Sequence, residues 1–126
     1  MGTTAPDCKP AGAAPGPRHR VLTEHLLIIT TLPDRETALS LARQLVRERL
    51  AACVNVGAPV TSVYEWQGAL QQDSEVMLTI KTRGERFDAL RDAIVARHPY
   101  ELPEIIATPI THGLPEYLNW IVERTE

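Results

Sequence analysis

The pattern of apolar positions begins with a short strand followed by a helix. Residues 26–31 form a continuous apolar run rich in β-branched side chains, which predicts a strand covered on both faces. Pro33 ends this run, and Asp34 together with Glu36 is typical of a helix N-terminus. Apolar side chains then recur at helical spacing, which predicts a helix to about Arg49 with one buried stripe. The stripe consists of Ala38, Leu41, Ala42, Leu45 and Val46.

The middle of the chain predicts a long hairpin. Residues 51–66 have the composition of a strand except at 57–59, where Gly-Ala-Pro predicts a bend or bulge. Residues 67–72 are expected to connect this strand to a second one at 74–81, in which apolar side chains alternate with others. The apolar face of the second strand consists of Val76, Leu78 and Ile80. Both strands are longer than a small sheet needs, so we expect their hairpin to project beyond the helices.

Two further helices and a fourth strand complete the pattern. Gly84 ends the second hairpin strand, and the helical spacing that follows predicts a helix stopped by Pro99. Residues 105–110 predict the fourth strand, and Pro115 suits the first position of a last helix. The inner stripes of the two helices are Phe87, Leu90 and Ile94, then Leu114, Tyr117, Leu118, Ile121 and Val122. Trp120 lies nearly opposite the last stripe, where a large aromatic side chain is either exposed or buried by a partner.

The order of elements is therefore β-α-β-β-α-β followed by a C-terminal helix. Two helices on one face of a four-stranded antiparallel sheet form a ferredoxin-like sandwich, which is an α+β fold. The 126 residues suffice for one such domain. We place it at residues 23–126, because residues 1–22 are rich in Pro and Gly and predict a disordered tail.

Composition excludes several classes of partner. The chain has a formal net charge of −3, and the tail holds Lys9, Arg18 and Arg20, so the domain itself is more acidic. An acidic surface predicts no nucleic-acid binding. The chain has two cysteines, no long apolar run and no secretory segment, so we expect a reduced, cytoplasmic protein with no membrane contact. Cys8 in the tail is expected to be an exposed thiol.

The densest polar chemistry lies at residues 98–105, where two prolines stiffen the chain. Imidazole and carboxylate groups on such a loop suit Cu(II) or Zn(II), with His98 and Glu101 as ligands and Glu104 nearby. His98 can equally favour the negative end of the preceding helix without binding a metal. Cys53 is a third candidate ligand, although a strand cysteine is more often a small apolar residue.

Other side chains have simpler interpretations. Glu75 and Lys81 share a strand face and are expected to form at most a solvated ion pair. Tyr64 and Trp66 also share a face, and we expect them to pack in a subunit interface rather than stack on bases.

Catalysis has little support in the sequence. No Ser-His-Asp arrangement, closed zinc motif or nucleophile beside a base is recognisable, and no Gly-rich phosphate loop is present. His25 and His112 lie near the ends of elements and are expected at the surface. We therefore predict that the chain is not an enzyme.

Five stretches carry a family resemblance, at residues 49–55 (RLAACVN), 62–68 (SVYEWQG), 81–82 (KT), 98–105 (HPYELPEI) and 117–120 (YLNW). In this order and spacing, from about Glu24 to Arg124, they resemble the CutA family of divalent-cation tolerance proteins. The resemblance implies a ferredoxin-like homotrimer whose long hairpins pair between subunits. It also implies tolerance of copper or another divalent cation, which the family is reported to bind.

The resemblance further implies a polar cleft between subunits. Lys81, Tyr100 and Glu104 would lie in that cleft. The fold also resembles the trimeric PII signalling proteins, which leaves an alternative function open. In that alternative, the trimer is a signalling or scaffold protein that holds a small anionic ligand in the cleft.

Two positions depart from the family pattern. Ala69 follows Gly68 where the family commonly has lysine, so any role of that lysine is absent here. Thr30 stands where some relatives have cysteine, so no thiolate pair with Cys53 is expected. A two-sulfur site for Cu(I) is correspondingly disfavoured.

Overall fold

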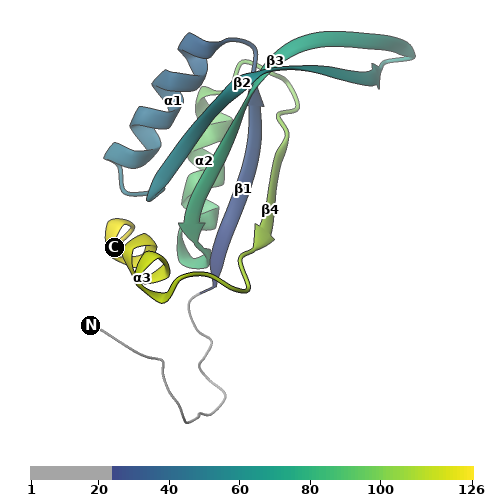
Figure 1. Cartoon of the computed structure of the whole chain (residues 1–126). Helices are drawn as coiled ribbons and strands as arrows, with labels where there is room; N and C mark the ends of the chain where they lie inside the picture. The colour runs from purple at the N-terminus through teal and green to yellow at the C-terminus, as the bar shows by residue number, and fades with distance from the viewer. Residues whose placement is uncertain (1–23) are drawn as a thin grey trace.

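The computed structural model describes residues 24–126, and the predicted disordered tail with Cys8 lies outside them. The described elements follow the predicted order (Figure 1). They are β1 (His25–Leu32), α1 (Arg35–Arg47), β2 (Cys53–Trp66), β3 (Ala69–Arg83), the short 3₁₀ turn η1 (Gly84–Arg86), α2 (Phe87–Arg97), β4 (Ile105–Pro109) and α3 (Pro115–Arg124). None of the helices in this part of the chain is long and apolar enough to span a membrane.

The four strands form one antiparallel sheet in the order β2-β3-β1-β4, and α1 and α2 cover one of its faces (Figure 1). This is the predicted ferredoxin-like sandwich. Its core forms because alternate strand residues meet the apolar stripes of the two helices. The fully buried large apolar residues of this core are Ile28, Leu32, Leu45, Leu78, Ile80, Leu90 and Ile94. The Asp34 carboxylate caps α1 by accepting a hydrogen bond of 2.8 Å from the Thr37 amide, as the sequence predicts.

The hairpin of β2 and β3 extends well beyond the helices, as expected (Figure 1). Pairing continues to Trp66 and Ala69, so the connection is only Gln67-Gly68 and not the predicted residues 67–72. Both turn residues have positive φ, 53° and 83°, which is the backbone form that a tight hairpin turn requires. A register shift between Val56 and Pro59 is the bulge expected at Gly-Ala-Pro.

Several predicted burial patterns are wrong for the single chain. Strand β1 is buried on its helix-facing side, but Leu27 and Ile29 on the other side are only half-buried. Helix α1 ends at Arg47, and Val46 is 42% exposed rather than part of the core. In α3 only Ile121 of the predicted stripe is buried. Periodicity identifies apolar faces, but it does not say whether this chain or another covers them.

Helix α3 lies across the ends of β1 and β3 and is held there by polar contacts. The Arg83 guanidinium donates to the Thr125 hydroxyl and carbonyl at 2.9 Å each, and Arg86 Nε donates to the same carbonyl at 2.6 Å. His25 Nε2 lies 3.2 Å from the Leu118 carbonyl oxygen. Burial is the main cause that lowers the pKa of His25, so the ring is neutral and donates this bond. His25 is therefore half-buried and structural, not the surface residue we expected.

Candidate functional site

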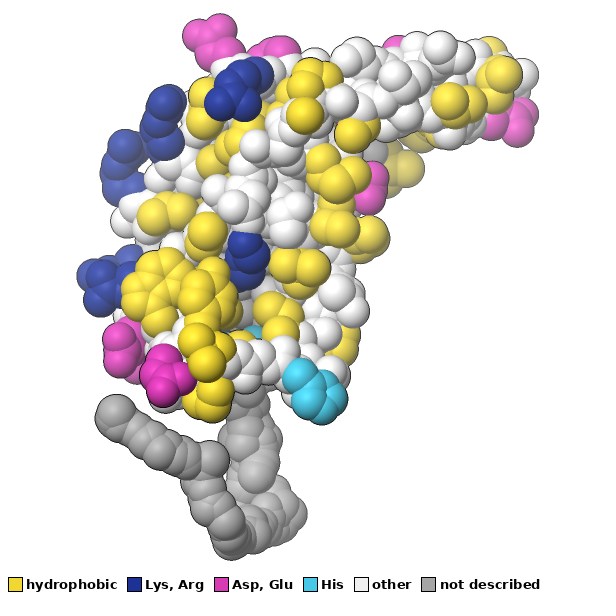
Figure 2. Space-filling model, in the orientation of Figure 1, with side chains coloured by type: hydrophobic (Ala, Val, Ile, Leu, Met, Phe, Trp, Pro, Cys, Tyr) yellow, Lys and Arg dark blue, Asp and Glu magenta, His cyan; other side chains and the backbone are white. Residues whose placement is uncertain are grey.

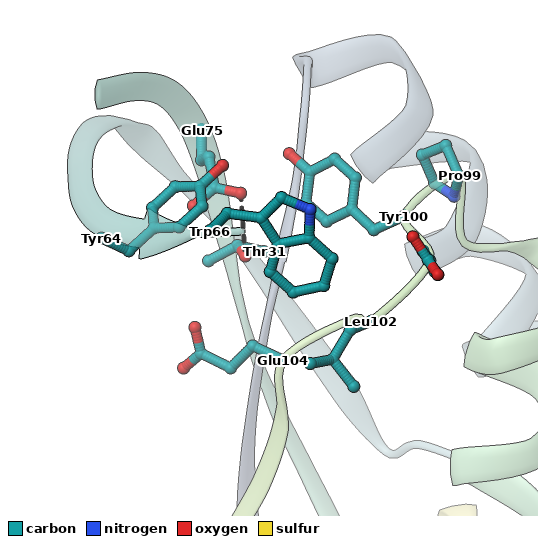
Figure 3. Close-up of a pocket in the computed structure, with 9 residues that line it drawn as sticks. Thr31, Tyr64, Trp66, Glu75, Pro99, Tyr100, Leu102 and Glu104 are labelled. Atoms are coloured by element: carbon teal, nitrogen blue, oxygen red, sulfur yellow. Dashed lines mark hydrogen bonds between the residues drawn. The ribbon is translucent and has the colours of Figure 1, made fainter. Parts of the chain in front are cut away.

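A pocket of about 440 Å³ opens where the hairpin leaves the sheet, between the hairpin and the loop that follows α2 (Figure 3). It lies on the side of the sheet that α1 and α2 leave uncovered, because Thr31 and Glu75 belong to that side of β1 and β3. The lining residues are Thr31, Tyr64, Trp66, Glu75, Pro99, Tyr100, Glu101, Leu102 and Glu104.

His98 holds the loop of the pocket in place. Its Nδ1 accepts a hydrogen bond from the Tyr100 backbone amide at 3.2 Å, so its Nε2 carries the hydrogen. Nε2 donates that hydrogen to the Thr31 carbonyl oxygen at 2.7 Å. The imidazole also packs on the Tyr100 ring, with ring centroids 4.7 Å apart. Both nitrogens of His98 are thus engaged within the chain, and the ring joins the loop to the end of β1.

A buried carboxylate forms the inner end of the pocket. Glu75 is only 8% exposed, and its Oε2 accepts a hydrogen bond of 3.3 Å from the Thr31 hydroxyl. Burial, followed by a hydrogen bond to Glu75, raises the pKa of Tyr100 far above its ordinary value. Tyr100 is therefore a neutral hydroxyl at any physiological pH and acts as a donor to the carboxylate.

Aromatic rings and carboxylates make up most of the remaining wall. Tyr64 donates to the Asp73 carboxylate, and this hydrogen bond is the main cause that raises the pKa of Tyr64. In Figure 3 the rings of Tyr64, Trp66 and Tyr100 lie along one side, with Leu102 and Glu104 across from them. Among the described residues that line the pocket, three are glutamates and none is Lys, Arg or His. The pocket therefore combines negative charge with aromatic surface.

A family model for "CutA1 divalent ion tolerance protein" matches residues 26–124, which is nearly all of the described chain. The chain belongs to this family. Apart from His25 at the start of β1, the match covers every described strand and helix, together with the pocket. The resemblance of the five sequence stretches to CutA is thereby confirmed.

Named relatives support the same family. The chain is 46% identical to the divalent-cation tolerance protein CutA of Thermus thermophilus, over 79% of this chain and 96% of that protein. It is 45% identical to the chloroplastic protein CutA of Arabidopsis thaliana, but covers 55% of that protein's length. The solved CutA1 structure from Oryza sativa superposes with a TM-score of 0.80 at 41% identity, covering 82% of this chain and 94% of that one.

The structure separates the predicted metal ligands. Glu101 lines the pocket, and His98 bonds to the pocket residue Thr31. Cys53 is at the opposite end of the hairpin strands. Cys53 is half-buried and lies near Tyr117. Burial is the main cause that raises the pKa of Tyr117, and the interaction with Cys53 raises it further. Within residues 24–126, no group of three or more His, Cys, Asp or Glu side chains is placed to hold a metal ion. The set His98, Cys53 and Glu101 is therefore not a metal site within one chain.

Within one chain, the residues predicted for the cleft between subunits do not lie together. Tyr100 and Glu104 line the pocket, but Lys81 lies six positions beyond Glu75 on β3, roughly 20 Å away at the rise of a strand. Its ammonium group donates to the Asn55 side chain instead. The expected Glu75–Lys81 ion pair is absent among the described residues for the same reason. A pocket lined by three glutamates does not favour a small anionic ligand.

Sequence reasoning missed the inner part of the pocket. Tyr64 and Trp66 were visible as aromatic residues sharing one face of β2, but we assigned them to subunit packing. Glu75 was expected to be solvated, but it is buried. The one available signal was a glutamate inside a strand whose next residues are apolar, since a charged side chain there needs a partner from another element.

Proposed function

We propose that this chain is a divalent-cation tolerance protein that works as a homotrimer and binds copper or another divalent cation without catalysing a reaction. The observation that carries the proposal is the 46% identity to the Thermus thermophilus protein of that name, over 96% of its length. The family model, at residues 26–124, also spans the core, the hairpin and the loop of the pocket.

The trimer is supported by apolar surface that one chain leaves open. On the uncovered side of the sheet, Leu27 and Ile29 are half-buried and Ile106 is 54% exposed. Hydrophobic side chains also gather over α3 (Figure 2), where Tyr117 and Trp120 are 40% and 38% exposed. These two rings contact each other in a tilted arrangement, with centroids 5.4 Å apart. Contiguous apolar surface of this kind is typical of a subunit interface.

A metal ion would need donors from more than one subunit. Among the described residues no single chain gathers three suitable side chains, and His98 would have to release one hydrogen bond to bind. Glu101 and Glu104 are exposed on the rim of the pocket and are our candidate donors, together with groups of a neighbouring subunit. Oxygen-rich sites of this kind suit divalent rather than monovalent copper.

Light scattering tests the assembly. We expect a particle of three times the 14.0 kDa chain that persists on dilution. A stable monomer at micromolar concentration would remove the basis for a site shared between subunits.

Calorimetric titration of Cu(II) and Zn(II) tests the binding. The full chain is compared with a chain that starts at Thr23, because Cys8 and His19 are metal-ligand types that precede the described residues. Binding in a fixed ratio to the trimer, retained in the shorter chain and weakened by Glu101→Gln with Glu104→Gln, supports the proposal. Binding seen only in the full chain refutes it.

The location of the protein stays a prediction. Composition favours the cytoplasm, whereas one solved relative, from Archaeoglobus fulgidus, is named a periplasmic protein. Fractionation of cells followed by detection of the native chain distinguishes the two compartments.

A further inference from the structure

We propose that the outer surface of helix α1 binds an acidic segment of another protein through a group of exposed arginines. We call this group the arginine face, and it consists of Arg43, Arg47 and Arg49 together with the exposed side chain of Val46. The inference goes beyond the proposed cation tolerance, because none of these side chains is a candidate metal donor.

The arginine face lies on the side of the molecule that the proposed homotrimer leaves open. Helices α1 and α2 cover one face of the sheet, whereas the apolar surface that supports the trimer lies on the other face and on α3 (Figure 1). Figure 2 shows that basic side chains gather over α1. A partner can therefore reach these arginines while the subunits stay together.

The end of α1 brings the three arginines close together. Arg43 and Arg47 are one turn apart, so their β-carbons are about 5–6 Å apart on the side of the helix that points away from the core. Arg49 follows the helix with a φ of 61°, and its backbone amide donates to the Val46 carbonyl oxygen at 3.0 Å, which keeps it beside the last turn. Val46 itself is 42% exposed and adds an apolar contact among the guanidinium groups.

The charges of the arginine face are not neutralised by the described chain. No carboxylate of residues 24–126 forms an ion pair with Arg43, Arg47 or Arg49. Glu48, which follows the helix, is instead paired with Arg97 of α2, with 3.5 Å between Oε2 and Nη2. Three guanidinium groups therefore remain available to a partner. Each presents its donors in a planar fork that fits a carboxylate.

The overall charge of the protein favours a short acidic segment over an extended anionic surface. The chain has a formal net charge of −3, and a homotrimer multiplies it. Charges more than about 8 Å apart are largely screened at physiological ionic strength, so a short segment interacts mainly with the arginines that it touches. A membrane or a nucleic acid would also approach exposed carboxylates nearby, such as Glu36 on α1 and Asp88 and Asp92 on α2.

Fluorescence anisotropy with a labelled peptide provides a direct assay. The probe is a peptide of five Glu-Ser repeats, and its uncharged control is a peptide of five Gln-Ser repeats. Each is titrated with the full chain at several salt concentrations. Calorimetry with the unlabelled peptides provides a second readout. Vesicles that contain phosphatidylserine test a membrane as the partner, and vesicles of phosphatidylcholine alone are their control.

A matched pair of variants locates the binding. Arg43→Gln with Arg47→Gln removes two charges from the arginine face, and Arg91→Gln with Arg124→Gln removes two exposed charges from α2 and α3. Both double variants have the same net charge, so they differ only in where the charge is lost. Light scattering on each variant establishes that the assembly is unchanged.

The expected result is saturable binding of the glutamate peptide that weakens with added salt. We expect this binding to be at least about tenfold weaker in the variant of the arginine face and almost unchanged in the control variant. Equal weakening in both variants would overturn the proposal, because binding would then follow net charge alone.

The other outcomes also decide the question. Equal binding of the glutamine peptide, or the absence of saturable binding by both methods, would overturn the proposal. Binding to phosphatidylserine vesicles but not to the glutamate peptide would overturn it as well, because the arginines would then serve a membrane.

Discussion

Replacing His98 with alanine is expected to loosen the loop of the pocket, while every side chain that lines the pocket stays unchanged. The change removes the hydrogen bond to the Thr31 carbonyl at 2.7 Å and the bond from the Tyr100 amide at 3.2 Å. It also removes the ring contact with Tyr100 at 4.7 Å. The two residues that would lose their partner, Thr31 and Tyr100, both line the pocket.

The size of the effect follows from these three contacts. Each hydrogen bond contributes about 0.5–1.5 kcal/mol net. A contact between aromatic rings adds about 0.5–1.5 kcal/mol. We therefore expect His98→Ala to lower the free energy of unfolding by about 2–4 kcal/mol per subunit. His112→Ala is the matched control, because His112 is exposed and, within residues 24–126, its ring bonds only to the neighbouring Thr111 hydroxyl.

Two measurements check this expectation. Denaturant unfolding is compared at one protein concentration, since the apparent stability of an oligomer depends on concentration. Hydrogen exchange at the Tyr100 amide gives a local readout, because that amide is bonded to His98 Nδ1 and should exchange faster in the variant. If His98→Ala and His112→Ala lower the free energy of unfolding equally, and the Tyr100 amide exchanges at its original rate, His98 does not hold the loop.

Three further changes test other parts of the fold. Burial lowers the pKa of His25 from 6.5, so the neutral ring stabilises the fold above that pH and stability falls on acidification. The melting temperature of the His25→Gln variant should therefore change less between pH 7.5 and 5 than that of the native chain. An equal change of melting temperature with pH in both proteins would contradict this. Arg83→Met removes the hydrogen bonds to Thr125, so it should lower the free energy of unfolding by about 2 kcal/mol and speed hydrogen exchange in α3. Arg91→Met, at an exposed position, should do neither. Gly68→Ala should lower the free energy of unfolding, measured with denaturant, by about 1 kcal/mol, because φ of Gly68 is 83°. An unchanged free energy of unfolding would mean that the turn adopts another backbone conformation.

The sequence by itself determined the elements and their order. Alternation at Val76, Leu78 and Ile80, the Asp34 cap and the stop at Pro99 each act over a few residues, so local physics is enough to predict them. The bulge at Gly-Ala-Pro and the projecting hairpin follow from the same local rules. The sequence also located part of the pocket, because Tyr100, Glu101 and Glu104 stand on one stiff loop.

Only the tertiary structure decided which distant side chains meet. Thr31 bonds to Glu75, 44 positions away, and to His98, 67 positions away, and no periodic pattern encodes such pairs. The antiparallel register of β3 brings Glu75 into the pocket and carries Lys81 to the far end of the strand, although both have the same parity in the sequence. The strand register and the order of the strands in the sheet set these distances. The charge of the pocket, which decides the kind of ligand that it favours, therefore follows only from the paired strands.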